Sequence, residues 1–465
     1  MRTLATALLA VAAAAARGWG GQSAPLSATP AVTVAPRCVR DGALLQATPA
    51  AAFGKKVYLV AWSDGSRMLG KETADITCAR VEPGTGRSLD PEGIVVCRAQ
   101  NLQGRPAVAF DGSRFLVVWQ DLRNGTDYDV YAARVGEDGK VLDPDGFAVI
   151  RRASNQARPA AAFAAGRTVV VWMDARQYPV YGLYFARVSP AGKVLDGDGL
   201  PLDAGEAARI AKVRPPRGTW LGDRQYWWHD LASRTAPAAA SNGRECLVAY
   251  MREYPFAGSG RPALTTARIR PGDASRTEPV KVTGGPAPAW TGKGWVLGGP
   301  VWKGGWTPQP RLGAALLGAM VTPSSRGDAQ TMAMPSGMTT PLATVDLVAA
   351  VGGGYNVGKG STASFPSCAA FGAPHAIVAM QYAWRPSRRD PTPTFAILAV
   401  RLSVEGGLKV LDAKPQVLAS AASPACVNHP ALAAGPAGEC LLVYEHDTDV
   451  KKCVITARIV RTKED

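Results

Sequence analysis

The sequence is built on a repeat of about 50 residues. Residues 106–146 and 159–199 share an apolar run ending in Trp-x-Asp-x-Arg, a second run ending in Ala-Arg-Val, and the turn Gly-Lys-Val-Leu-Asp-x-Asp-Gly. Short apolar runs separated by glycine turns at such a period are typical of a radial or solenoid array of β-sheets. The repeat therefore restricts the chain to all-β architectures.

Three anchors locate seven copies of the repeat: a proline opens the first strand, a large side chain ends the second, and an arginine lies in the third. The prolines are Pro49, Pro106, Pro159, Pro237, Pro288, Pro366 and Pro430. The second-strand anchors are Trp62, Trp119, Trp172, Tyr250, Trp302, Met380 and Tyr444. The arginines are Arg80, Arg134, Arg187, Arg268, Arg401 and Arg458, and the fifth copy has Met320 at this position.

Each copy divides into four predicted strands, because β-branched and aromatic runs alternate with Gly/Asp turns. The sequence predicts one domain over residues 31–465, a seven-bladed β-propeller with four antiparallel strands per blade. The last copy stops after its third strand. We therefore expect the extended run Ala31–Arg40 to supply its fourth strand and close the ring, which hides two sheet edges. Insertions near residues 204–235 and 322–362 interrupt the repeat.

Residues 1–24 have the features of a secretory signal peptide: Arg2, an apolar run from Leu4 to Ala16, and small residues after it. The apolar run is too short to span a membrane. We expect an exported monomer without a membrane span, located outside the cell or in the periplasm.

The chain carries a formal net charge of +15. The charge suits an acidic polysaccharide, a lipid surface or nucleic acid, or it reflects a diffuse arginine excess. No run of five or more basic residues appears, which favours the diffuse excess and gives no reason to expect a specific nucleic-acid partner.

Eight cysteines in an exported chain suggest disulfides. Neighbouring third and fourth strands predict a Cys78–Cys97 bridge in the first copy, and Cys38–Cys453 would lock the ring, with Cys426 as a rival partner. The unassigned cysteines are Cys246, Cys368, Cys426 and Cys440. No Cys-x-x-Cys pair exists and the four histidines are scattered, so no metal or cofactor is expected.

The recurrent polar residues have framework and functional interpretations. Trp119-Asp121-Arg123 recurs as Trp172-Asp174-Arg176. Because one asymmetric ligand rarely needs the same residues in every blade, the sequence favours a packed Trp with Asp and Arg satisfying each other or loop backbone. The third-strand arginines are expected to pair with carboxylates of the Asp90, Asp143, Asp196 and Asp412 type. Asp-x-Asp-Gly is interpreted as a turn rather than a calcium loop, which needs more oxygen ligands.

The frame LVVWQDLRNGTDYDVYAARVGEDGKVLDPDG resembles the repeat of many secreted bacterial proteins with predicted β-propeller folds, mostly of unknown function. The resemblance is strong over residues 49–199. It implies a propeller and export, and it supplies no catalytic residues. The sialidase-type motif SxDxGxTW and the full DxDxDG calcium loop are both missing.

The elaborated loops, between second and third strands and between successive copies, all emerge on one face, where a binding site is expected. Segment 218–230 concentrates aromatic side chains that could stack on sugar rings or hold a peptide. The alternative is a lid that buries its own tryptophans. The predicted ligand-binding residues are Trp220, Arg224, Tyr226, Trp227, Trp228, His229, Tyr254, Arg261, Trp384 and Arg388.

The sequence favours a secreted binding or scaffold protein, with a carbohydrate or peptide ligand at the loop-rich face, over an enzyme. The alternative is a polysaccharide hydrolase or lyase in the propeller mouth, which needs paired carboxylates, or a base such as His229 or Tyr226. A purely structural surface module is the third interpretation. The candidate carboxylates are Asp64, Asp121, Asp174, Asp223, Asp230, Glu253 and Asp390.

Overall fold

The computed structural model describes residues 25–36, 45–68, 71–176, 181–204, 236–252, 263–281, 287–300, 311–317, 343–346, 355–356, 364–385, 394–412, 414–423, 425–436, 438–449 and 452–462. Within these ranges every regular element is a β-strand, which confirms the all-β prediction. No helix there is long and apolar enough to cross a bilayer. The predicted signal peptide lies outside the described residues.

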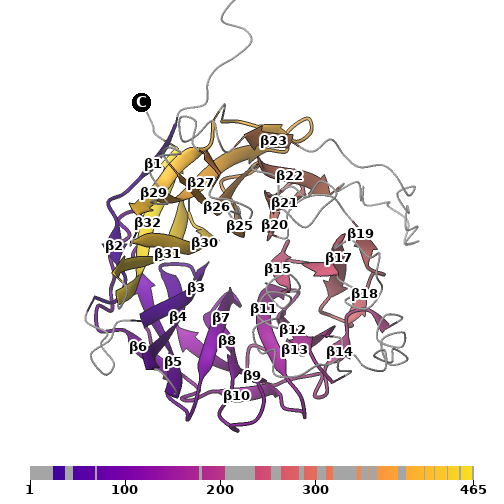
Figure 1. Ribbon diagram of the computed structural model, residues 1–465. Coiled ribbons are helices and arrows are strands. Elements are labelled where there is room, and N and C mark those ends of the chain that lie inside the picture. The colour runs from indigo at the N-terminus through magenta and orange to yellow at the C-terminus, as the bar shows by residue number, and fades with distance from the viewer. Residues whose placement is uncertain are drawn as a thin grey trace, which may run out of the picture.

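The second and third copies fold as predicted, each into a four-stranded antiparallel sheet. The second sheet contains β7 (Gln103–Phe110), β8 (Arg114–Asp121), β9 (Asp129–Gly136) and β10 (Phe147–Ile150). The third contains β11 (Gln156–Ala164), β12 (Arg167–Asp174), β13 (Gly182–Val188) and β14 (Leu200–Pro201). The sheets are arranged radially as in a β-propeller, with the first strand of each nearest the centre (Figure 1).

The fourth, fifth and sixth sheets are antiparallel as well, and in the fourth and sixth two separate outer strands pair with the third long strand. The fourth contains β15 (Ala238–Ser241), β16 (Cys246–Arg252), β17 (Ala263–Arg270), β18 (Ser275–Arg276) and β19 (Val280–Lys281). The fifth contains β20 (Ala287–Trp290), β21 (Trp295–Pro300), β22 (Arg311–Leu317) and β23 (Ala343–Asp346). The sixth contains β24 (Tyr355–Asn356), β25 (Ser364–Ala370), β26 (His375–Arg385), β27 (Thr394–Ser403), β28 (Lys409–Val410) and β29 (Gln416–Ala422).

The first and last copies lie side by side. The first contains β3 (Leu45–Phe53), β4 (Tyr58–Met68), β5 (Lys71–Val81) and β6 (Ile94–Cys97). The last contains β30 (Cys426–Ala434), β31 (Cys440–Asp449) and β32 (Lys452–Thr462), and β1 (Leu26–Ala28) and β2 (Val32–Thr33) pair antiparallel with β32. A single parallel bridge between Leu45 and Cys453 joins both copies into one nine-stranded hydrogen-bonded sheet.

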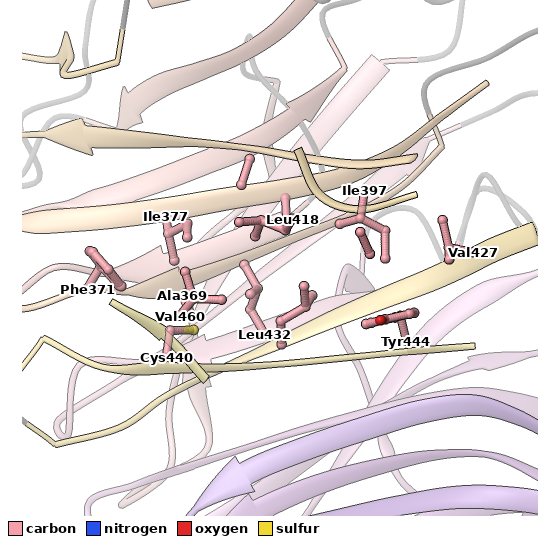
Figure 2. Close-up of a cluster of buried hydrophobic side chains, with 14 residues drawn as sticks. Ala369, Phe371, Ile377, Ile397, Leu418, Val427, Leu432, Cys440, Tyr444 and Val460 are labelled. Atoms are coloured by element: carbon pink, nitrogen blue, oxygen red, sulfur yellow. The ribbon is translucent and has the colours of Figure 1, made fainter. Parts of the chain in front are cut away.

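The core consists of apolar clusters between successive sheets rather than one central core. Figure 2 shows the cluster between the sixth and last copies, where Ile377 and Ile397 face Leu432 and Tyr444. An equivalent cluster joins Trp62 and Val60 of the first copy to residues of the last copy such as Leu441. Each sheet is thus buried on both faces, which suits its long unbroken apolar strands.

The third-strand arginines form the predicted ion pairs. Arg134 Nε and Asp143 Oδ2 are 2.8 Å apart, and the pairs Arg80–Asp90, Arg187–Asp196 and Arg401–Asp412 repeat the arrangement. The Arg134 guanidinium also donates to Pro190 O of the next sheet at 3.4 Å. The arginine therefore fixes the fourth strand of its own sheet and touches its neighbour.

Three anchor assignments in the fifth copy are wrong, those of Pro288, Trp302 and Met320. In the fifth sheet Trp290 pairs with Trp295 across the first turn, and Val296 pairs with Leu316. Leu316 therefore takes the place assigned to Met320, and the assigned Trp302 lies beyond β21 and outside the described residues. The cause is the choice of anchor: Pro288 pairs with Leu297 as Val108 pairs with Val117 in the second sheet, so it lies two residues beyond the place of Pro106.

Arg458 is displaced by one position in the last sheet. It pairs with Leu442 rather than with Leu441, so its side chain points to the opposite face from Arg134. There it donates to Leu418 O of the sixth sheet at 2.6 Å.

The predicted disulfides are not formed. Cys78 pairs with Ile94 and Cys97 with Ile76, so the register of β5 and β6 does not set the two cysteines opposite each other, and both are free thiols. Cys453 is also free and donates to Gln46 O at 3.0 Å, while Cys38 lies outside the described residues. Burial raises the pKa values of these thiols, so they behave as packed apolar groups.

Replacing Asp143 by Asn is expected to lower the free energy of unfolding by about 1–2 kcal/mol at pH 7, because it removes a charge-assisted pair. The hydrogen bond from Arg134 lowers the pKa of Asp143. Its stabilisation is therefore present above the unfolded pKa of about 3.9 and lost as the pH falls below it. Urea unfolding at pH 7 and pH 3 checks both statements. Glu82→Gln, in an exposed pair with Arg87, is the control and should change nothing measurable.

Candidate functional site

The innermost strands share a β-bulge just before the anchor proline. The register shifts between Ala47 and Ala50 in β3, and at the same place in β7, β11 and β30. The residue before each proline has a left-handed backbone, with φ of 52° at Thr48, 51° at Arg105, 53° at Arg158 and 44° at His429. Non-glycine residues rarely adopt this conformation, so four adjacent occurrences indicate a conformation imposed by the fold.

Buried glutamines hold this bulge in the first three copies, which read QATP, QGRP and QARP. Gln46, Gln103 and Gln156 are fully buried. The Gln103 amide donates to Gln100 O and the Gln156 amide to Ser154 O, each at 2.8 Å, and Gln46 Oε1 accepts from Ile455 N at 2.9 Å. The glutamines therefore satisfy backbone groups next to the inner strands, either in the segment before the strand or, for Gln46, in β32.

Side chains that follow the second-strand anchors connect the bulges to neighbouring sheets. Gln120 accepts from Arg158 N at 3.1 Å, and Glu445 accepts from Thr48 N at 2.6 Å. Gln381 of the sixth sheet donates to Asn428 of the last, next to the bulge. These contacts join the inner strands of the third, first and last sheets to the sheet that precedes each of them around the ring.

The bulge residues lie at the loop-rich face. Gln103 pairs with Asp121 and Gln156 with Asp174, so each bulge lies beside the end of a second strand, where the loop to the third strand begins. We call Thr48, Arg105, Arg158, His429 and Glu445 the mouth cluster. Its members come from four adjacent inner strands, β30, β3, β7 and β11, and from β31 (Figure 1).

Glu445 is the centre of the mouth cluster. Its Oε1 accepts from Thr48 N, and its Oε2 lies 2.8 Å from His429 Nδ1. Burial lowers the pKa of Arg105, and the charge of Glu445 acts in the opposite direction. One buried carboxylate thus interacts with a histidine, a backbone amide and a guanidinium.

Arg105 and Arg158 place two positive charges close together at partly buried positions. Burial, and then the like charge of Arg105, lower the pKa of Arg158 to about 9. Both guanidinium groups remain charged at neutral pH. A phenol accompanies each arginine: Tyr128 acts electrostatically on Arg105, and Tyr181 acts on Arg158.

The repeated Trp-x-Asp-x-Arg residues belong to the framework, as the sequence predicts. Trp119 Nε1 donates to Asp121 Oδ2 at 2.7 Å, and Arg123 donates to both carboxylate oxygens while lying 3.8 Å above the ring of Tyr131. Trp172, Asp174, Arg176 and Tyr184 repeat every contact in the third sheet. Asp121 and Asp174 are fully buried and committed to these bonds.

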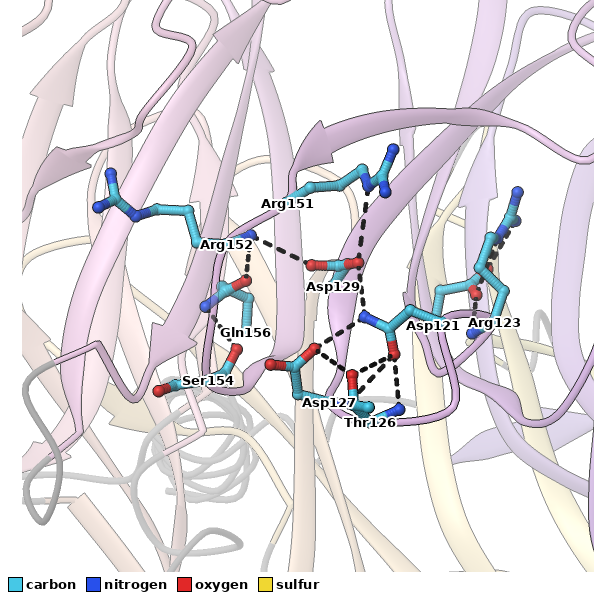
Figure 3. A network of polar contacts seen from close by, with 10 residues as sticks. Asp121, Arg123, Thr126, Asp127, Asp129, Arg151, Arg152, Ser154 and Gln156 are labelled. Carbon is cyan, nitrogen blue, oxygen red and sulfur yellow. Dashed lines mark hydrogen bonds and ion pairs between the residues drawn. The ribbon is translucent and has the colours of Figure 1, made fainter.

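Figure 3 shows a second polar network, in the loop after β8. Asn124 donates to Asp127 Oδ1 at 2.7 Å and to Asp129 Oδ2 at 3.2 Å, and Asp129 Oδ1 accepts from Arg152 N at 3.3 Å. Burial raises the pKa of Asp129, and the hydrogen bond from Arg152 N acts in the opposite direction. The network holds loop backbone, and no group of three metal-ligand side chains occurs among the described residues.

The Asp-x-Asp-Gly sequences are turns. Asp143 and Asp196 pair with arginines, and Gly146 N donates to Asp143 O at 3.0 Å. Gly199 has φ of 69°, and a Cβ there would lie 2.6 Å from the ring of Trp172. The glycine is required because the tryptophan packs against it.

The predicted ligand-binding residues fall almost entirely outside the described part of the chain. These are Trp220, Arg224, Tyr226, Trp227, Trp228, His229, Tyr254, Arg261 and Arg388. Trp384 lies in β26, where it pairs with Asn356 and Thr394. Among the candidate carboxylates, Asp223, Asp230, Glu253 and Asp390 also lie outside the described residues.

Sequence reasoning missed the mouth cluster, although a signal was present. The anchor prolines are preceded by Thr48, Arg105, Arg158 and His429, and the short motif Gln-x-x-Pro marks three of these sites. The variable residue before an invariant structural proline could have identified them. Glu445 carries no such signal, because only tertiary structure brings it to Thr48.

No protein-family model and no curated protein sequence matches the chain. It is similar in structure to the subtype N10 neuraminidase-like protein of A/little yellow-shouldered bat/Guatemala, with 10% identity, a TM-score of 0.40, and 94% of this chain and 100% of that chain covered. It is also similar to the β-propeller domain of the Pyrococcus furiosus Trilobed protease, with 7% identity, a TM-score of 0.40, and 89% of this chain and 95% of that chain covered. A thermostable family-43 glycoside hydrolase is similar with 10% identity, a TM-score of 0.39, and 78% of this chain and 92% of that chain covered.

Replacing Asp121 or Asp174 by Ala is expected to lower the free energy of unfolding by about 3–5 kcal/mol, because each change removes the acceptor of a partly buried arginine and of a buried indole N–H. Urea unfolding measures the loss, which should be similar for the two. Asp121→Asn keeps an acceptor for Trp119 and should lose less. A variant that unfolds like the parent would contradict the framework role.

Proposed function

We propose that this protein is a secreted β-propeller that binds a carbohydrate or peptide at its loop-rich face. The mouth cluster is the observation that supports the proposal. Four adjacent inner strands present side chains of different chemistry on one repeated backbone conformation, at the face where functional loops are expected.

We propose further that the ring has seven blades and that the N-terminal segment closes it. The nine-stranded sheet then counts as two blades, the first and the last, in contact through a single parallel bridge. The antiparallel pairing of β1 and β2 with β32 supports their role as the outer strand of the last blade. Val34 and Ala35 are fully buried between these two blades, which favours closure by packing.

The alternative function is a polysaccharide hydrolase or lyase. A glycosidase needs two carboxylates about 5–10 Å apart with access to substrate. Asp121 and Asp174 are buried beneath their arginines, which does not favour this function. Binding without catalysis is therefore the function that the described residues support best.

Export follows from the same proposal. Residues 1–24 act as a cleaved signal peptide, and the mature chain functions as a monomer outside the cell or in the periplasm. Free thiols are compatible with export because burial shields those of Cys78, Cys97 and Cys440.

Deleting residues 25–36 from the mature protein should lower the melting temperature and promote association, because it exposes the edge of β32. Thermal unfolding and light scattering measure both effects. Deleting residues 1–24 alone is the control and should leave the fold unchanged. If the longer deletion behaves like the control, the N-terminal segment does not close the ring.

Binding itself is tested with an array of neutral and acidic glycans together with a peptide library. The full mature chain is expected to retain a subset of these ligands. His429→Ala, which removes the partner of Glu445 at the mouth, should weaken that retention about tenfold. A folded protein that retains nothing on either array would contradict the proposed function.

A further inference from the structure

We propose that the mouth cluster binds the carboxylate groups of an acidic polysaccharide, with one carboxylate held between Arg105 and Arg158. This inference rests on the proposed binding function and specifies its ligand class. It follows from the backbone, the neighbouring side chains and the charges at these two positions.

The backbone separates framework from function at this place. Thr48, Arg105, Arg158 and His429 lie in four equivalent bulges and have φ between 44° and 53°. The fold therefore accepts threonine, arginine or histidine at this place. The bulge does not require arginine. The backbone therefore does not explain why the second and third sheets carry arginine at this place, where the first carries threonine and the last histidine.

The second and third sheets also share the accompanying phenol. On the third strand Trp119 pairs with Tyr131, and Trp172 pairs with Tyr184. Tyr128 and Tyr181 lie three residues before these partners and so occupy equivalent places. In the first and last sheets this place is taken by Ala74 and Cys453. The second and third sheets, unlike the first and the last, thus present an arginine with a partly exposed tyrosine.

The electrostatics favour an anion between the two arginines. Each guanidinium is partly withdrawn from water, and the two repel each other. Glu445 acts on Arg105, but the same carboxylate already serves His429 and Thr48 N. A ligand carboxylate would offset the repulsion, and its planar geometry matches that of a guanidinium group.

The tyrosines favour a polysaccharide over other anions. Flat phenol rings beside each arginine suit the apolar faces of sugar rings. Two equivalent Arg–Tyr units in adjacent sheets suit a ligand that itself repeats, such as a chain of uronic acid residues. An acidic peptide and a nucleic acid are also negatively charged, so the test below includes both as competing ligands.

The test measures binding of an oligogalacturonate to the full mature protein by calorimetry, beside a neutral galactose oligomer of equal length. Arg105→Gln and Arg158→Gln should each weaken oligogalacturonate binding by about tenfold or more. Arg87→Gln is the matched control, with the same loss of charge on an exposed side chain at the opposite face, and should leave affinity unchanged. Arg105→Lys keeps the charge without the fork and should lose part of the affinity.

A stability measurement separates a binding role from a structural one. Since burial disfavours the charge on Arg105, Arg105→Gln should maintain or raise the melting temperature of the free protein. A large fall would assign Arg105 to the framework and overturn the proposal.

The remaining outcomes separate the two proposals. Equal loss of oligogalacturonate binding in Arg87→Gln and Arg105→Gln would indicate a diffuse basic surface and overturn the site. The ligand class would be overturned if the protein bound the neutral oligomer, an acidic peptide or single-stranded DNA more tightly than oligogalacturonate. Preference for the neutral oligomer or for the peptide would still agree with the proposed binding function. No retention of any glycan or peptide by the folded protein would overturn both proposals.

Discussion

The contact between the apolar faces of successive sheets is the interaction on which the rest of the structure depends. Trp62, Trp119 and Trp172 are fully buried in these contacts, and no sheet could stand alone with both faces apolar. The same packing explains why Gly146 and Gly199 are glycines, because each lies against one of these rings. The recurrent residues of the sequence are consequences of this one requirement.

The polar residues fall into two groups, one that stabilises the sheets and one that lies at the mouth of the ring. Asp121 and Asp143 are bound to arginines of their own sheets, and they hold loops and outer strands in place. The mouth cluster stands on the inner strands, where the bulge fixes the backbone and leaves the side chain open to variation. A ring of rigid, repeated backbone with variable side chains is suited to evolve a binding site without disturbing the fold.

Elements of the fold that depend on local sequence were predictable. Alternating runs and Gly/Asp turns located the strands of the second and third copies, and recurrence alone assigned Asp143 to Arg134. Arg458 was misassigned because side chains alternate between the two faces of a sheet, so a displacement of one residue reverses the face. The fifth copy was misassigned because its anchors were counted from Pro288, which lies two residues beyond the place that Pro106 has in the second sheet. Cys78 and Cys97 failed to pair because the register of β5 with β6 sets Cys97 opposite Ile76, two residues from Cys78.

By itself the sequence determined an all-β chain with repeated antiparallel sheets, and it marked Trp-x-Asp-x-Arg as framework, because these features follow from local periodicity and recurrence. Tertiary structure alone decided that Glu445 meets Thr48 and His429, and that Arg105 and Arg158 act on each other. Those contacts join residues from different copies, up to 397 positions apart in the chain. Their proximity depends on the order of sheets around the ring, which no local pattern encodes.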